Sequence, residues 1–508
     1  MSVLPFRPGW RRALPVVLLA MAFGAMALPA LADETGDPSV ARISLLDGAV
    51  SVTRADSGET VAAAVNAPLM AGDSVSTQSA SRAEVQFDYA TMLRLGSNAQ
   101  VRLARLDPAE HVVQLAAGTV ELSVLRATQA HPEIETPSVD VRAGQPGRYR
   151  ITITRDGNTE ITVRSGRAEV LWPRGAQPLL PGKTLLVQGP AENPQFQYLA
   201  SVAYDDFERW NDRRDRDLAR YQGYAYASDF AGSADLYQYG RWADVAGYGS
   251  VWVPSEAPGW APYRDGRWVW EPYYGWTWVG DEPWGWAPYH YGRWFYQPAV
   301  GWCWYPGPLY LHRFWRPALV VFIGFGPGDV NLFLGFGNIG WVPLAPFEVF
   351  RPWWGPRYVV NRTTIINQTT NIYNVTNVRT AYRNINAPNG LTAVRARDFT
   401  AGRFNRYVSV QSADLSRGMA VRSVLPIVPT TENLRLSGRQ SSPLTGRSTP
   451  PAHPFRMFTT PQRPVWFSQQ RDAVRAAPVR VAPKAPETGE QRRGEGQPRA
   501  SSRAVRSQ

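Results

Sequence analysis

The feature that most restricts the fold of this 508-residue chain is a tryptophan-rich repeat with a period of 26 residues. Gly-Arg-Trp occurs at 240–242, 266–268 and 292–294, and Gly-Trp-Ala-Pro-Tyr occurs at 259–263 and 285–289. Repeats of this length indicate one supersecondary unit that has been copied and stacked. The sequence therefore predicts a Trp/Pro-rich repeat domain over residues 237–354.

Each repeat contains two short runs in which tryptophan alternates with another residue, at 268–270 and 276–278 in the second copy, with a Pro/Gly turn between them. Alternate side chains of a strand lie on one face, so we interpret each unit as a β-hairpin whose tryptophans pack on its neighbour. Most indoles are then core, because a unit rich in glycine and proline has few aliphatic side chains to bury. Cys303, the single cysteine, is expected to be a small buried residue.

Some aromatic rings of the repeat lie in turn-like Gly/Pro segments, where we expect them to be exposed. Exposed rings of this kind can stack on sugar rings or contact a protein. The candidate ligand-binding residues are Trp260, Tyr263, Trp286, Tyr289 and Tyr291.

The same region contains carboxylates and histidines that raise the alternative of an enzyme. Glycoside hydrolysis needs two carboxylates that face each other across a bond, but Asp281 and Glu282 are adjacent and favour a solvated turn. His290 and His312 lack the short spacing of metal ligands. The sequence therefore predicts no catalytic, metal-binding or cofactor-binding residue and no cofactor, and a cell-wall carbohydrate enzyme is the disfavoured alternative.

Residues 40–190 show short runs of alternating polarity, such as 83–87 and 92–95, separated by Gly, Asp, Asn and Pro. Short strands at regular spacing predict a β-sandwich or β-solenoid. The segments 48–52, 68–77 and 83–87 resemble the FecR-type periplasmic domain. The resemblance implies a β-helix-like or sandwich domain that makes protein contacts.

The resemblance to FecR-type proteins does not extend to the N-terminus. Transmembrane FecR regulators carry a cytoplasmic helical region that handles a sigma factor, followed by a membrane helix. Here Arg7, Arg11 and Arg12 precede an apolar stretch at 13–28 and a small-residue cleavage site at 30–32. This pattern is typical of a secretory signal peptide over residues 1–32, so we expect a periplasmic or extracellular protein. The tryptophan-rich region in turn resembles a Trp/Pro-rich region of unknown function that often follows FecR-type domains in exported bacterial proteins.

Three further segments complete the predicted organisation. A helix over 204–221, with Asp205 or Asp206 at its start, lies in a connector at 200–225. Residues 355–437 are expected to hold an extended Asn/Thr-rich strand within a partly ordered region, because Val and Ile recur every six residues from 360 to 378. Residues 438–508 are rich in Pro, Ser, Arg and Gln and predict a basic disordered tail.

Charge distribution bears on the partners. The chain carries a net charge of +12, and residues 351–508 hold 25 Lys and Arg against 7 Asp and Glu. A basic tail on an exported protein suggests an anionic envelope surface, or a merely solvated tail, and no nucleic acid. We therefore expect a mainly β, non-catalytic envelope protein that acts as an interaction or scaffold module for protein or polysaccharide. The alternative function is a FecR-like periplasmic signalling component.

Overall fold

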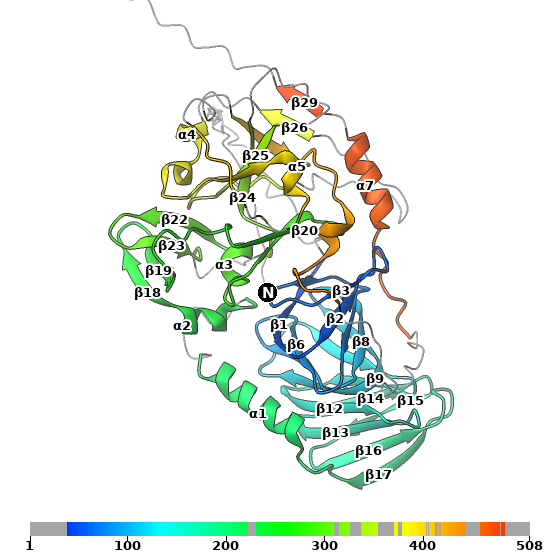
Figure 1. Cartoon of the computed structure of the whole chain (residues 1–508). Coiled ribbons are helices and arrows are strands. Elements are labelled where there is room, and N and C mark those ends of the chain that lie inside the picture. Colours follow the sequence, from blue (N-terminus) through cyan, green and yellow to red (C-terminus); the bar gives the residue numbers. More distant parts are fainter. Residues whose placement is uncertain are drawn as a thin grey trace, which may run out of the picture. The chain divides into compact units, whose positions relative to one another are not determined.

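The computed structural model describes residues 38–221, 230–308, 314–325, 337–353, 370–373, 378–402, 404, 406–411, 415, 418–441, 458–477 and 479–482. These residues form a mainly β protein, as the sequence predicts (Figure 1). The predicted signal peptide and His312 lie outside the described residues. No helix among the described residues has the length and apolarity to cross a membrane.

The β domain (residues 38–200) consists of two sheets that share one long strand, β9 (Glu110–Val124). The first half of β9 pairs with β8 (Gln100–Leu106) and the second half with β7 (Thr91–Leu95). Gly118 stands between the two halves with a φ of +79°, and a Cβ atom there would lie 2.5 Å from Cα of Ala99. Glycine is therefore required at the point where the strand passes from one sheet to the other.

The strands of both sheets follow one another closely in space. Sheet A runs through β4 (Pro68–Leu69), β1 (Ala41–Asp47), β6 (Arg82–Gln86), β7, β9, β12 (Gly147–Ile153), β13 (Thr159–Ser165), β16 (Lys183–Gln188) and β17 (Gln195–Ala200). Sheet B runs through β3 (Thr60–Ala62), β2 (Val50–Thr53), β5 (Ser74–Thr77), β8, β9, β10 (His131–Glu135), β11 (Asp140–Ala143), β14 (Ala168–Trp172) and β15 (Gly175–Leu179). Neighbouring strands are antiparallel except β9 and β10, which are parallel.

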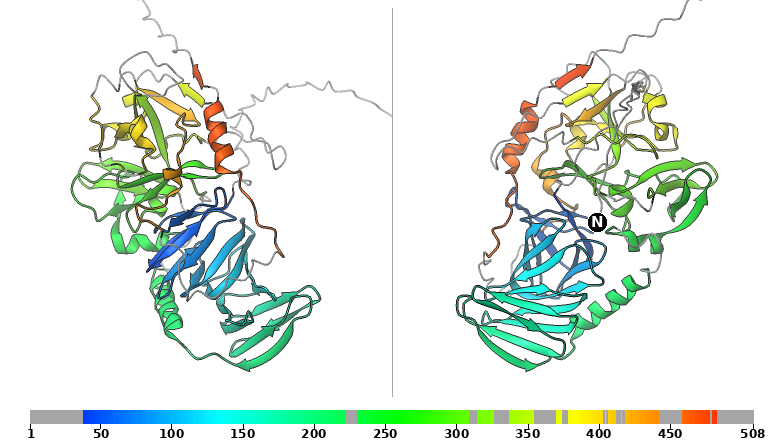
Figure 2. Two further views of the ribbon diagram at one scale, coloured as in Figure 1. Left: turned by 45° about the vertical axis from the view of Figure 1, so that its right-hand side comes forward. Right: turned by 180° about the vertical axis from the view of Figure 1, so that it is seen from behind.

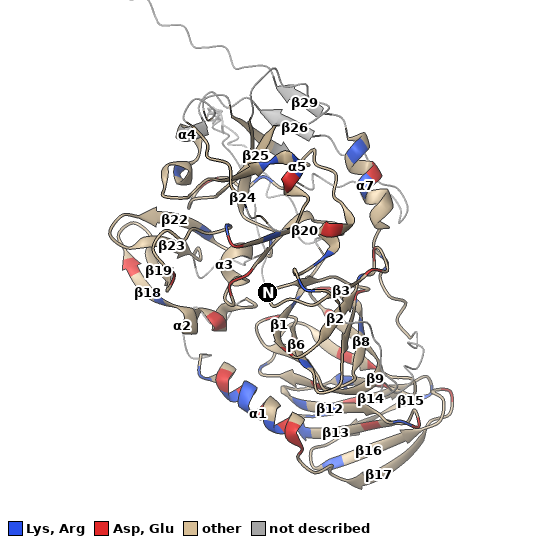
Figure 3. Cartoon of the chain, in the orientation of Figure 1, with Lys and Arg blue, Asp and Glu red and all other residues tan. Residues whose placement is uncertain are grey.

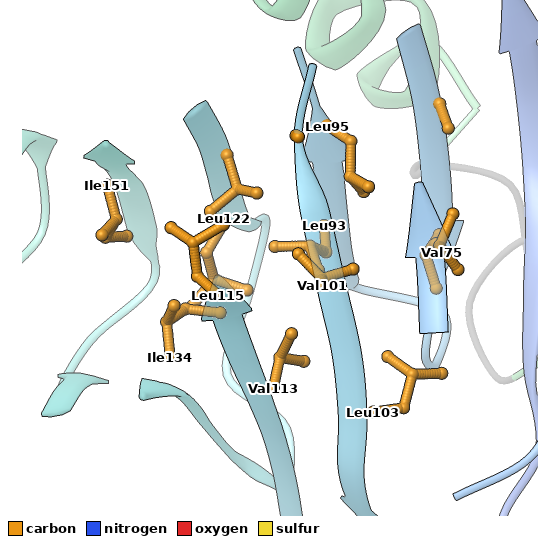
Figure 4. Close-up of a cluster of buried hydrophobic side chains, with 14 of the residues drawn as sticks. Val75, Leu93, Leu95, Val101, Leu103, Val113, Leu115, Leu122, Ile134 and Ile151 are labelled. Carbon is orange, nitrogen blue, oxygen red and sulfur yellow. The ribbon is translucent and has the colours of Figure 1, made fainter. Parts of the chain in front are cut away.

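Alternating aliphatic residues of the two sheets bury one shared core. Val75, Leu93, Val101, Leu115 and Leu122 lie within it (Figure 4). The domain extends past the predicted end at residue 190, because β17 pairs with β16 along its whole length.

A single helix, α1 (Asp206–Ala219), follows the β domain. The Asp205 side chain accepts a hydrogen bond from the backbone N–H of Glu208, 2.9 Å away, and so caps the first turn. The predicted connector helix is thus present within 204–221. Short helical turns η1 (Ser233–Asp235) and α2 (Leu236–Tyr239) lead into the next domain.

The Trp-rich domain contains three hairpins at the three copies of the repeat. They are β18 (Gly240–Val245) with β19 (Gly249–Pro254), β20 (Gly266–Glu271) with β21 (Gly275–Gly280), and β22 (Arg293–Gln297) with β23 (Gly301–Tyr305). In each hairpin the equivalent tryptophans are paired: Trp242 with Trp252, Trp268 with Trp278, and Trp294 with Trp304. The hairpin interpretation is therefore confirmed.

The hairpins do not stack in sequence order. The first and third join into one four-stranded sheet through Trp252 and Trp304, whereas the second forms a separate two-stranded sheet. Between the second and third hairpins lies a helical turn, α3 (Ala287–His290).

A six-stranded sheet completes the chain and corrects the predicted boundary at residue 354. Its order is β27 (Thr392–Arg395), β25 (Asn338–Pro343), β24 (Val320–Phe325), β28 (Met419–Ser423), β26 (Thr370–Tyr373) and β29 (Val479–Ala482). The short helices around it are α4 (Val378–Ala381), η2 (Arg383–Asn386), α5 (Ala396–Phe399) and η3 (Thr431–Leu434). Of the predicted Asn/Thr strand only β26 lies within the described residues.

The prediction of a disordered tail from residue 438 is wrong for part of that segment. Phe467–Ala476 form a helix, α7, and residues 479–482 form β29 (Figures 1 and 2). The helix buries Phe467 and Val474 in the same core as the indoles. Tertiary packing thus orders a stretch whose composition alone favours disorder.

Candidate functional site

The predicted ligand-binding aromatics lie mostly inside the Trp-rich domain. Tyr263, Trp286 and Tyr289 are fully buried and Tyr291 is 8% exposed, whereas Trp260 is half-buried. The expectation that these rings are exposed is therefore wrong for four of the five. The rings are drawn inward because their polar atoms find partners there: the Tyr263 hydroxyl donates to the carbonyl of Tyr289, 2.6 Å away.

Three of the five aromatics meet around Glu282. Trp260 Nε1 and the Tyr289 hydroxyl both donate to Glu282 Oε1, over 3.1 and 2.7 Å. Tyr263 packs on Tyr289 with ring centroids 4.6 Å apart. The result is a carboxyl group enclosed by aromatic rings.

Glu282 itself is buried, and Oε2 of its carboxyl has no hydrogen-bond partner among the described residues. Burial raises its pKa to about 8. Asp281, next to it, is exposed and does not face it across a cleft. The predicted solvated turn therefore holds for Asp281 but not for Glu282.

His290 lies in the aromatic core as well. Its Nδ1 is 2.7 Å from the carbonyl oxygen of Arg316, and its ring packs against Trp286 and Trp315. Burial lowers its pKa to about 3, so the imidazole is neutral near neutral pH. These contacts give His290 a packing role.

A carboxylate group that the sequence analysis missed lies in sheet B. Oxygens of Glu133, Glu135 and Asp140 come within 4.8 Å of one another, a geometry that a hard cation such as Ca²⁺ can use. Two of the three carboxylates already have protein partners. Arg142 Nε donates to Glu133 over 2.9 Å, and Gln114 Nε2 donates to Glu135 over 2.8 Å.

The β domain and the Trp-rich domain meet through a buried group of charges. We call Arg54, Asp56, Asp73 and Glu271 the interdomain cluster. Arg54 donates from its two terminal nitrogens to the two carboxylate oxygens of Glu271, over 2.6 and 2.9 Å, and also to the carbonyl of Trp270. Both side chains are at most 1% exposed.

The interdomain cluster sets one cation against three carboxylates. Burial by itself lowers the pKa of Arg54, but Glu271, Asp56 and Asp73 outweigh burial and raise it above its ordinary value. Burial raises the pKa of Glu271 to about 8 and that of Asp73 to about 6, against the attraction of Arg54. Protonation therefore relieves part of the excess negative charge, while Arg54 stays charged.

Further polar contacts cross the same domain interface. Arg42 donates to Asp235 over 2.7 Å, and Asn66 Nδ2 donates to the backbone carbonyl of Glu282 over 2.9 Å. Arg42 and Asn66 are both buried. No local sequence pattern marks these contacts, because each joins residues about two hundred positions apart.

Helix α1 is held on sheet A mainly by ion pairs. Glu84 binds Arg94 and Arg214 over 2.8 and 2.9 Å, and Arg94 also binds Asp215 over 2.7 Å. Acidic and basic residues alternate along the helix (Figure 3). The face of sheet A beneath α1 is therefore charged.

Comparisons with known proteins identify two segments of the chain. Residues 73–169 match the FecR protein family, and residues 233–348 match a family of unknown function (DUF6600). The sequence resemblances are thereby confirmed for these segments. A search of curated proteins finds no match.

Among solved structures, the chain is similar to two crystal structures of a candidate anti-sigma factor from Parabacteroides distasonis ATCC 8503. The first is 18% identical over 27% of this chain and 64% of that chain, so this chain spans less than two thirds of its length. The second is 15% identical over 36% of this chain and 99% of that chain. Both have a TM-score of 0.24, which is too low to carry a functional argument.

Proposed function

We propose that the protein is an exported, non-catalytic regulatory component of the cell envelope. In this proposal the FecR-type β domain makes the protein contacts, and the Trp-rich domain is its rigidly attached partner. The FecR family match at residues 73–169 supports the regulatory role over a purely structural one. The buried pair between Arg54 and Glu271 is the observation that carries the proposal.

A regulatory protein needs coupling between its parts, since a signal at one site must alter the free energy of another. A buried ion pair fixes the geometry of an interface, because any displacement leaves a charge without its partner in a dry environment. The interdomain cluster therefore ties the orientation of the Trp-rich domain to the turn at residues 54–56. Binding to either domain would be felt by the other.

A second candidate function, binding of wall polysaccharide, is favoured by one exposed aromatic group. Phe347 is 79% exposed, and its ring centroid lies 6.3 Å from that of Tyr248 and 6.2 Å from that of Tyr305. Such a group offers ring faces to a sugar. The originally predicted residues, other than Trp260, lack that exposure.

The regulatory proposal is tested in a deletion strain of the source organism by measuring transcript levels. We expect envelope genes to change expression in the deletion strain and wild-type protein to restore them. Arg54→Ala should fail to restore them at equal abundance in the envelope fraction, whereas Arg142→Ala, a change in the exposed Arg142–Glu133 pair, should succeed. Unchanged transcripts in the deletion strain would contradict the proposal.

The polysaccharide alternative has its own readout. Purified protein is sedimented with peptidoglycan, and Phe347→Ala is compared with Tyr198→Ala, a change of another exposed aromatic residue in the β domain. We expect little co-sedimentation for either protein. Strong co-sedimentation that only Phe347→Ala abolishes would favour polysaccharide binding instead.

A further inference from the structure

A C-terminal segment crosses the outside of both domains. We call residues 458–476 the C-terminal strap; it comprises an extended stretch followed by α7 (Figure 2). On sheet B, the backbone N–H of Thr459 donates to Glu135 Oε1 over 2.9 Å, and Gln114 Nε2 donates to the carbonyl of Thr459 over 3.0 Å. The N–H of Gln462 donates to the carbonyl of Ala104 over 3.0 Å. The strap thus contacts β10, β9 and β8 through its main chain.

The second half of the strap reaches the interdomain cluster. The N–H of Phe467 donates to the carbonyl of Asp56 over 2.8 Å, and Trp270 Nε1 donates to Gln470 Oε1 over 2.8 Å. Asp56 belongs to the β domain, and Trp270 precedes Glu271 in the Trp-rich domain. The start of α7 therefore spans the two sides of the Arg54–Glu271 pair.

The surface beneath the strap is shaped for a passing backbone. Gly72 has a φ of +94°, and a Cβ atom there would lie 2.7 Å from the carbonyl oxygen of Gln462. A larger residue would push the strap away. The absence of a side chain at this point gives the strap its seat.

The strap buries few side chains for its length. Pro461, Phe467 and Val474 are buried, whereas Val465 is 41% and Trp466 is 56% exposed. Recognition by main-chain hydrogen bonds and a few apolar anchors is the mode by which extended peptides bind folded domains. A segment held in this way can exchange without unfolding the sheet beneath it.

Charge also suits a particular kind of segment. The surface carries the carboxylates of Glu133, Glu135 and Asp140, and the strap holds Arg463 before its helix and no acidic residue before Asp472. Electrostatic complementarity therefore favours neutral or basic segments and disfavours acidic ones.

We propose that the outer face of β8, β9 and β10, with the turn at 54–56, is a docking surface for an extended neutral or basic polypeptide segment, and that the C-terminal strap is its exchangeable occupant within the same chain. A partner's segment of this chemistry gains the surface only when the strap leaves. The biological purpose rests on the proposed regulatory function, but the docking itself concerns this chain alone. Failure of the two proposals is therefore distinguishable.

The test uses a labelled peptide of residues 458–477 and fluorescence anisotropy with the full-length protein. The strap is weakened by Phe467→Ala with Thr459→Pro, which remove an anchor and a main-chain donor. Because the tethered strap competes at high effective concentration, we expect the weakened chain to bind the peptide about tenfold or more tightly than wild type does. The control chain Gln469→Ala, a change of an exposed strap residue, should behave as wild type.

A peptide that itself carries Phe467→Ala should bind the weakened chain about tenfold or more weakly, because the main apolar anchor is lost. Equal binding of the peptide to wild-type and weakened chains would overturn the proposal, as would no binding to a weakened chain whose circular dichroism is unchanged. Hydrogen exchange gives a second readout. Gly72→Ala should accelerate exchange at Gln462 and Phe467, with no change in β12; unchanged exchange at these two amides would also overturn the proposal.

Discussion

Replacing Arg54 by alanine is expected to be among the most destabilising single changes in this protein. Arg54 is 1% exposed and is the cation that faces the carboxylates of Glu271, Asp56 and Asp73. Removing one partner of a buried ion pair costs about 3–5 kcal/mol, because the other charge stays buried without compensation. The ratio of folded to unfolded protein should fall by about a hundredfold to several thousandfold.

The assay is urea unfolding of the full chain, followed by tryptophan fluorescence and far-ultraviolet circular dichroism. Arg142→Ala is the matched control, since Arg142 is 42% exposed and pairs with Glu133 on the surface of the same domain. Exposed pairs contribute about 0–1 kcal/mol, so this variant should stay close to wild type. Equal midpoints for Arg54→Ala and Arg142→Ala would refute the reasoning that the interdomain cluster stabilises the fold.

Three further changes test other parts of the structure. Glu282→Gln should flatten the loss of stability between about pH 4.5 and pH 8, measured by thermal unfolding, because the folded state keeps a proton that the unfolded state releases above pH 4.5; an unchanged pH slope would contradict this. Trp268→Ala should cost about 3–5 kcal/mol in urea unfolding, since the indole is fully buried, whereas the exposed Trp466→Ala should change stability by about 0.5 kcal/mol or less; similar losses for both would argue against an indole core. Glu84→Gln should speed hydrogen exchange in α1, because it leaves two buried arginines without their shared carboxylate, and the exposed Asp206→Asn should not; exchange that is equal in both variants would show that ion pairs do not hold the helix.

The hairpins of the Trp-rich domain were predictable because the repeat fixes both spacing and alternation. A period of 26 residues places Trp268 and Trp278 in the same relation as Trp294 and Trp304, and the structure pairs both couples across a hairpin. Helix α1 was predictable for a local reason as well, since Asp205 is a good capping residue. Local signals of this kind survive in a single sequence.

The inward position of Tyr289 was not predictable from its Gly/Pro surroundings. Such segments usually lie at the surface, but here a Cβ atom on Gly280 would lie 2.5 Å from the Tyr289 ring, and one on Gly285 would lie 3.1 Å from it. The glycines therefore make room for a ring and do not mark an exposed turn. Only the packed structure distinguishes the two roles of glycine.

Long-range charge pairs and the α7 helix escaped prediction for a related reason. Arg54 and Glu271 are 217 positions apart, and no periodicity joins them. Phe467 and Val474 are the only buried side chains of α7, which is too few for a clear amphipathic pattern. In both cases the stabilising contact is supplied by another domain.

The most direct test of the account is whether the β domain and the Trp-rich domain unfold together. Hydrogen exchange during a urea titration reports β9 of the first domain and β21 of the second in one experiment. The interdomain cluster predicts one shared transition in wild type, with separate transitions in Arg54→Ala. Two separate transitions in the wild-type protein would contradict the claim that buried charges join the domains into one unit.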